Sequence, residues 1–262
     1  MAMWKTVQAS VMGSSHHRQG TPCQDSHRVS ELSINGRSCL IVVCSDGAGS
    51  ASHSHIGSDI ACERFMTIAS QAFVDQQIRH DLARSQVMEW LDLIRSDIDR
   101  QASSLGLSVR DLACTLLAVV VTDKCSVFLQ VGDGAIVTLD DYTCEAIFWP
   151  QSGEFANTTN FLTDSSVGEV AAFRVTSDRP KSFAVFTDGL ERLILRFVDH
   201  SVHRPFLTPF FERMRITECC DALVDPLRRF LDSDGVNERT DDDKTLILAM
   251  CMSETNDVPL GD

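Results

Sequence analysis

The chain has 262 residues, of which 44% are hydrophobic and 23% are charged, and its formal net charge at neutral pH is −14. This composition is typical of a globular protein long enough to bury one extended hydrophobic core. The negative charge argues against nucleic acid and against an anionic membrane surface as the main partner. An anionic substrate would therefore need a local cation or an arginine in order to bind.

Apolar runs rich in β-branched residues predict the strands. In chain order these runs cover residues 6–12, 40–44, 115–122, 126–131, 145–149, 182–186 and 245–250. The short polar segment TDKC at residues 122–125 separates two of them and predicts a tight hairpin connection.

Four segments are predicted to be helical. The two long ones, at about residues 56–73 and 87–98, each keep one apolar face, and Gly106 predicts the end of the second. Shorter helices are predicted at residues 190–198 and 219–231, where Pro226 lies either in a first turn or at a break. Strands and helices do not alternate strictly, so an α+β layered fold with antiparallel hairpins is favoured over a doubly wound parallel sheet.

The remaining segments limit the cellular context. Residues 153–169 are expected to be a surface loop and residues 253–262 a frayed tail. No run approaches the roughly 18 apolar residues of a membrane span, and the first residues lack the apolar core of a secretory signal. The 10 cysteines form no CxxC pair, and several lie in apolar segments. We therefore expect reduced thiols in a cytoplasmic protein.

Carboxylates stand where predicted strands end. Asp46, Asp133 and Asp188 each follow a strand and precede a glycine, Asp242 belongs to an acidic run before the last strand, and Asp25 follows the first strand. A single Asp-Gly pair is a common turn signal. Several carboxylates at one rim of a sheet would repel one another, and a hard divalent cation such as Mg2+, Mn2+ or Ca2+ would relieve this repulsion.

Two other metal sites do not fit the sequence. The acidic segment from Asp232 begins like a calcium-binding loop, but Gly235 stands at its fourth position and the loop requires glycine at the sixth. A zinc site is disfavoured because no pair of histidines has helical ligand spacing beside a cysteine or glutamate.

Six blocks of sequence, in order, suggest a family. They are GTPCQDS, VVCSDGAGS, ACTLLAVVV, VGDG, FTDGL and DDDKTLILA. Together they resemble the metal-dependent protein phosphatases of the 2C type, most closely the bacterial branch, over about residues 11–252. The resemblance implies one domain over residues 1–262 with a four-layer α-β-β-α sandwich, in which two antiparallel sheets pack face to face and are flanked by helices.

The resemblance also implies a metal site with two Mn2+ or Mg2+ ions and room for a third. The implied roles are Asp46 as the residue bridging two ions, Gly47 as a carbonyl ligand of the second ion, Asp188 and Asp242 as ligands of the first ion, Asp25 as the holder of metal-bound water, and Asp133 with Asp188 at a third ion. Thr115 and Thr245 are expected to be structural, with the Thr245 hydroxyl supporting the turn at Asp242.

The sequence departs from the family pattern at two positions. Gln24 stands where many members have a glutamate, which removes a charge beside the second ion. Ala48 stands where eukaryotic members have a histidine that is thought to protonate the leaving group. The proton must then come from another source.

The implied reaction is hydrolysis of phosphoserine and phosphothreonine, with phosphotyrosine as a further candidate substrate, by a hydroxide that bridges two ions. The expected partners are proteins that a serine/threonine kinase phosphorylates in bacterial signalling. Arg18 is a candidate for a bidentate phosphate contact, and His16 is a candidate phosphate ligand or proton donor. His53 and His55 either face the cleft or begin a helix. A pseudophosphatase that only binds, and a phosphatase of small molecules, remain as alternatives.

Overall fold

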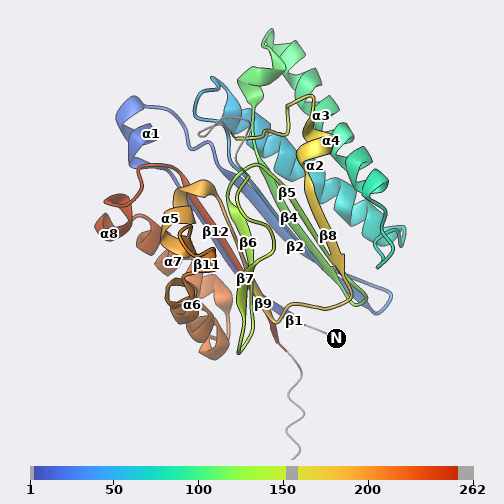
Figure 1. Cartoon of the computed structure of the whole chain (residues 1–262), viewed down its shortest axis with the longest axis vertical. Helices are drawn as coiled ribbons and strands as arrows, with labels where there is room; N and C mark the ends of the chain where they lie inside the picture. Colours follow the sequence, from blue (N-terminus) through green and yellow to red (C-terminus); the bar gives the residue numbers. More distant parts are fainter. Residues whose placement is uncertain (1–2, 152–158, 253–262) are drawn as a thin grey trace, which may run out of the picture.

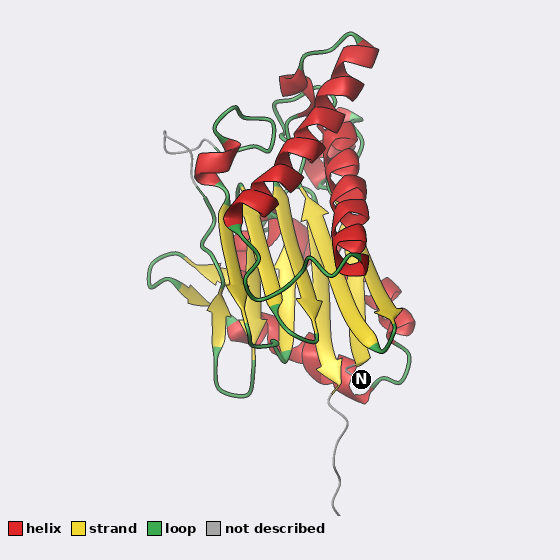
Figure 2. Cartoon of the chain, turned by 90° about the vertical axis from the view of Figure 1, so that its right-hand side faces the viewer, coloured by secondary structure: helices red, strands yellow, loops and turns green. Residues whose placement is uncertain are grey.

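The computed structural model describes residues 3–151 and 159–252, and its main strands form two antiparallel sheets that pack face to face (Figures 1 and 2). The first sheet has the strand order β1 (Met3–Val11), β12 (Lys244–Met252), β9 (Ser182–Phe186), β6 (Ala135–Leu139) and β7 (Cys144–Ala146). The second sheet has the order β2 (Ser26–Ile34), β3 (Arg37–Ser45), β4 (Leu116–Thr122), β5 (Ser126–Val131) and β8 (Ala172–Thr176). A small hairpin, β10 (Leu195–Arg196) with β11 (Ser201–Val202), contacts β7.

Helices cover the outer faces of both sheets (Figure 1). The second sheet is covered by α2 (Ser54–Val74) and α3 (Arg84–Leu105). The first sheet is covered mainly by α6 (Arg204–Ile216) and α7 (Val224–Leu231), with the short α5 (Glu191–Ile194) and α8 (Asp234–Asn237) beside them. The remaining short helices are α1 (Ser14–Gln19) and α4 (Val167–Val170), with 3-10 turns at Val109–Leu112, Asp188–Leu190 and Cys220–Leu223. The predicted four-layer α-β-β-α sandwich is confirmed.

Three layers of buried apolar side chains hold the sandwich together. Between the sheets, Leu40 and Leu117 of the second sheet belong to the same cluster as Phe183, Val185 and Ile247 of the first. Every residue of β4 is buried because both of its faces are covered. This explains why its sequence is a continuous apolar run without alternation.

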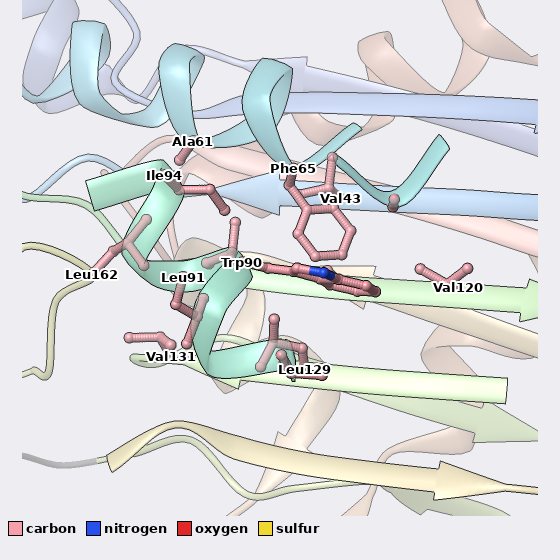
Figure 3. Close-up of a cluster of buried hydrophobic side chains, with 14 of the residues drawn as sticks. Val43, Ala61, Phe65, Trp90, Leu91, Ile94, Val120, Leu129, Val131 and Leu162 are labelled. Atoms are coloured by element: carbon pink, nitrogen blue, oxygen red, sulfur yellow. The ribbon is translucent and has the colours of Figure 1, made fainter. Parts of the chain in front are cut away.

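The outer cluster beneath α2 and α3 is built around two aromatic rings (Figure 3). Phe65 of α2 and Trp90 of α3 meet edge to face with ring centroids 6.3 Å apart. Val120 and Leu129 of the sheet belong to the same cluster. This packing fixes both long helices on the second sheet, whose strand ends carry two of the candidate metal ligands.

Most predicted elements are confirmed, two of them with the predicted bounds, β5 and β9. Gly106 ends α3 with φ +69°, and Pro226 lies in the first turn of α7. The predicted helix over residues 190–198 is wrong beyond Ile194, because the chain turns into the β10–β11 hairpin, where His200 has φ +51°. The strand predicted over residues 145–149 is β7, which ends at Ala146.

Other features lie outside the predictions or beyond the described residues. The sequence reading missed β2, β6, β8, α1 and α6. The predicted tail at 253–262 and residues 153–158 of the predicted loop lie outside the described residues. All 10 cysteines are free, as expected. Among the described residues, no helix combines the length and apolar character needed to cross a membrane.

Candidate metal centre

Three of the predicted aspartates meet at one end of the sandwich. Asp46 follows β3, Asp133 follows β5 and Asp188 follows β9. Each contributes a carboxylate oxygen, and the three oxygens lie within 4.8 Å of one another. Two of these residues follow strands of the second sheet and one follows a strand of the first. The face-to-face packing of the sheets therefore brings the cluster together.

The backbone of Asp46 is fixed by Thr115, the residue before β4. The Asp46 N–H donates to the Thr115 hydroxyl at 2.9 Å, and the Thr115 N–H donates to the Asp46 carbonyl at 2.8 Å. The Ser45 hydroxyl donates to the Thr115 carbonyl at 2.6 Å. These bonds give Thr115 the structural role that the sequence predicted.

A tight turn presents Asp133. Gly134 has φ +80°, and a Cβ at this position would lie 2.6 Å from the carbonyl oxygen of Phe186. Only glycine combines this left-handed conformation with such a close approach. The Thr159 hydroxyl donates to the Asp133 carboxylate, so the chain beyond β7 also contributes to the orientation of this side chain.

The glycine after Asp188 allows two segments of the site to touch. A Cβ on Gly189 would lie 2.0 Å from the carbonyl oxygen of Asp243. The turn after β9 therefore packs directly on the backbone that begins β12. Asp188 and Asp242 come from these two neighbouring segments.

The carboxylate of Asp25 is held by two threonine hydroxyls. Its Oδ2 accepts from Thr187 at 2.8 Å and from Thr245 at 2.6 Å. The prediction that the Thr245 hydroxyl supports the turn at Asp242 is therefore wrong, because this hydroxyl supports Asp25. Both threonines lie in the first sheet or at its end, so they dock Asp25 against that sheet.

The carboxylates of the cluster are buried and repel one another. Burial, followed by the negative charges of Asp188, Asp25 and Asp242, raises the pKa of Asp46 well above its usual value. Burial and the charges of Asp133 and Asp242 do the same to the pKa of Asp188. Burial also raises the pKa of Asp133, of Asp242 and of Asp25, the last to about 7.

The donor set fits hard divalent cations. Asp25 Oδ1 and Asp188 Oδ1 are buried and find no hydrogen-bond partner among the residues that the structure describes. A buried carboxylate oxygen without a donor is costly unless a cation binds it. The clustered ligand atoms are all oxygens, which favours Mg2+ or Mn2+ over zinc.

The structure shows what surrounds Gln24 and Ala48, the two residues that depart from the family pattern. Gln24 is buried, its carbonyl accepts from Gly47 N–H at 3.2 Å, and its Oε1 lacks a partner. Gly47 packs so closely on Ser54 that a Cβ would lie 2.7 Å from that side chain. Ala48 is buried in a small apolar cluster with Phe161, so no proton donor occupies its position.

His16 and Arg18 lie on α1, beside the acidic segment that begins β12. His16 is 7% exposed, and its Nδ1 lies 2.9 Å from Asp243 Oδ1. Arg18 is exposed and forms an ion pair with Asp241 at 2.9 Å. Neither residue belongs to the three-aspartate cluster, and their predicted roles toward phosphate remain predictions.

A cavity of about 490 Å3 adjoins the site. Asp25 and Cys23 line one part of it, and His55, Asp59 and Gln101 line another. His53 directly precedes α2 and His55 lies in its first turn, so both stand at the start of a helix. His55 in addition shares this cavity with Asp25.

Sequence reasoning missed the supporting residues. Thr159 and Thr187 hold the carboxylates of Asp133 and Asp25, yet nothing in their local sequence pattern marks them. Asp243 is the partial exception, because its place in the acidic run was visible. Its contacts with Gly13 and Gln24 depend on the folded chain.

Comparison with known proteins agrees with this arrangement. The model of the family described as "Protein phosphatase 2C" matches residues 12–232. The curated Serine/threonine-protein phosphatase 3 of Escherichia coli (strain K12) is 37% identical in an alignment of 253 residues that covers 94% of this chain and 98% of that protein.

Solved structures of low sequence identity share the fold. The catalytic domain of the serine/threonine protein phosphatase PstP, in complex with two manganese ions, superposes with a TM-score of 0.63 at 16% identity. The match covers 97% of this chain and 100% of PstP. For the phosphatase 2C of Toxoplasma gondii the TM-score is 0.64 at 13% identity, with 96% of this chain and 95% of that one covered.

The site and the fold thus define a hydrolase of phosphate esters. The chain belongs to the protein phosphatase 2C family, as the family match over most of its length and the 37% identical relative establish. The family resemblance drawn from the six sequence blocks is confirmed.

Proposed function

We propose that this chain removes phosphate from phosphoserine and phosphothreonine in proteins, with two Mn2+ or Mg2+ ions as cofactors. The convergence of Asp46, Asp133 and Asp188, with buried oxygens that lack partners nearby, carries the proposal. The Escherichia coli relative named as a serine/threonine phosphatase and the two manganese ions of PstP support it.

The proposed metal ligands are those of the family pattern. Asp46 would bridge two ions, with Asp188, Asp242 and the Gly47 carbonyl completing their shells, and Asp25 would orient water at the site. Asp133 with Asp188 would hold a third ion. Bound in this way, the ions supply an activated water for attack on phosphorus and offset the charge of the phosphoryl group.

The chain's own residues complete the site for a phosphoprotein. His16 is proposed to contact the phosphoryl group or to donate a proton to the leaving group. Arg18 is proposed to clamp the phosphate, for which it must leave its exposed ion pair with Asp241. The cavity beside Asp25 has room for residues that flank the phosphorylated one, and its carboxylates favour basic neighbours.

The wider setting follows from the same proposal. The substrates are phosphoproteins made by a serine/threonine kinase, in a cytoplasmic signalling pathway of the bacterial type. Neither nucleic acid nor a membrane is proposed as a partner, given the net charge of −14. Residues 1–262 are proposed to form one domain, since β12 completes the sheet that begins with β1.

The test is phosphate release from a phosphothreonine peptide by the purified chain after treatment with EDTA and addition of Mn2+. We expect hydrolysis to depend on Mn2+ and to disappear in Asp46→Ala, which should keep its circular dichroism spectrum. Phosphotyrosine peptides and free phosphorylated metabolites serve as parallel substrates. Full turnover by Asp46→Ala would refute the site, whereas hydrolysis of metabolites alone would favour a small-molecule phosphatase.

A further inference from the structure

Asp243 joins the start of β12 to the segment that connects β1 with β2. Its side chain is 1% exposed. Oδ1 accepts from the Gly13 N–H at 2.6 Å, and Oδ2 accepts from the Gln24 N–H at 2.5 Å. His16 Nδ1 lies 2.9 Å from Oδ1, at ion-pair distance but without good hydrogen-bond alignment.

The segment fastened in this way, residues 12–25, carries much of the proposed site. Asp25 follows directly after one anchor, Gln24, and His16 lies three residues after the other, Gly13. Gly13 also packs on the backbone of Asp242, where a Cβ would lie 2.3 Å from the carbonyl carbon. This carboxylate is therefore one of the contacts that set the position of the segment relative to the proposed metal ligand Asp242.

The contacts require an aspartate. The two hydrogen-bond partners are backbone N–H groups, and the third neighbour is His16 Nδ1 at ion-pair distance. A carboxylate offers an acceptor oxygen to each backbone group. An asparagine of the same shape would turn its NH2 group toward one of the backbone N–H groups, and two donors would then face each other in a buried site.

We propose that Asp243 is a positioning residue of the phosphatase, which holds Asp25 and His16 in register with Asp46 and Asp242. This inference rests on the proposed function of the site. Nδ1 of His16 faces Asp243, so Nε2 is the ring nitrogen proposed to reach a phosphoryl oxygen or a leaving group.

The test compares Asp243→Asn with Asp141→Asn in the full chain. Asp141 is an exposed partner of Lys181 at 2.7 Å, so its substitution makes the same charge change on the surface. Mn2+ binding is measured by titration calorimetry, and kcat and KM are measured for a phosphothreonine peptide at saturating Mn2+. For Asp243→Asn we expect Mn2+ affinity and kcat each to fall by about 10- to 100-fold, as for other residues that orient metal ligands. Asp141→Asn should match the wild type.

A double-mutant cycle with His16→Ala distinguishes positioning from general stability. If Asp243 orients His16, the double variant should lose less kcat than the product of the two single losses, because each substitution disables the same imidazole. A merely structural residue would reduce the yield of folded protein but not kcat per folded molecule. The inference is overturned if the kcat losses of the two single variants multiply in the double variant. It is also overturned if Asp243→Asn keeps the wild-type Mn2+ affinity and kcat.

Asp243→Glu provides a second test in case Asp243→Asn does not fold. It keeps an acceptor-only carboxylate but lengthens the side chain by one methylene group, so we expect a folded protein with kcat reduced about 10-fold. Wild-type kcat in a folded Asp243→Glu protein would also overturn the inference. The proposed function is tested separately, by the Mn2+ dependence and substrate panel of the wild type and by Asp46→Ala, none of which involves Asp243.

Discussion

Replacing Asp25 by asparagine should stabilise the metal-free protein at neutral pH. Asp25 accepts hydrogen bonds from the hydroxyls of Thr187 and Thr245 on the same oxygen. The amide oxygen of asparagine can accept both, so the substitution removes the charge and keeps the bonds. Burial and the neighbouring Asp243 both make the ionised form of Asp25 unfavourable.

The magnitude follows from proton linkage. The pKa of Asp25 is raised from 3.8 to about 7 in the folded chain. The folded state therefore holds this proton more tightly than the unfolded state does. The resulting stability is fully present below pH 4 and is lost as the pH rises to 7, at about 1.4 kcal/mol for each pH unit. The loss from Asp25 alone is then on the order of 3–4 kcal/mol.

Urea unfolding in EDTA, followed at several values between pH 4 and pH 8, measures this effect. The free energy of unfolding of Asp25→Asn should fall less steeply with rising pH than that of the wild type, so that the variant is the more stable protein at pH 7.5. Groups whose pKa does not depend on Asp25, such as His27 with its pKa lowered to about 4 by burial, contribute equally to both proteins and cancel in the comparison. Loss of the Asp25 charge also reduces the upward pKa shifts of Asp46 and Asp188, which flattens the pH profile of the variant further. Parallel pH profiles would refute the reasoning. Added Mn2+ should stabilise the wild type more at pH 7.5 than at pH 5.

Two further predictions address the phosphate and the core. Arg18→Ala should raise KM for a phosphopeptide several-fold while leaving Mn2+ affinity unchanged. It should change the free energy of unfolding by under about 1 kcal/mol, because the ion pair of Arg18 is exposed. An unchanged KM in steady-state kinetics would exclude a phosphate contact. Phe65→Ala should lower the free energy of unfolding by about 3–5 kcal/mol, because it leaves a cavity against Trp90. Leu93→Ala, at a position 46% exposed on α3, is the matched control for urea denaturation and should cost far less.

Sequence patterns predicted the bounds of two continuously buried strands. The strands β5 and β9 are covered on both faces, so their apolar runs end where the strands end. The aspartates of the site were visible for the same reason, because a charged residue directly after such a run marks the rim of the sheet. Their convergence depends on two sheets packing face to face, which the family resemblance implied and spacing alone did not.

The missed elements lack such patterns. β2 is an edge strand whose residues are mostly half-exposed, so its sequence has little apolar periodicity. Helix α6 contains Pro205 in its first turn and Pro209 inside, and both obscure a helical reading. The wrong prediction at residues 190–198 has a related cause. Leu193, Ile194 and Leu195 form a buried apolar run, and such a run is compatible both with a helix and with a turn into a hairpin. Tertiary contacts decide between such readings.

The position of β12 between β1 and β9 has a consequence for biosynthesis. Nine residue pairs join β12 to β1, and five join it to β9, so β1 has no partner in its own sheet until residues 244–252 have left the ribosome. The second sheet, which is complete by Thr176, can assemble earlier. Because Asp242 arrives together with this last strand, a nascent chain cannot assemble the full set of proposed acidic ligands before β12 inserts between β1 and β9.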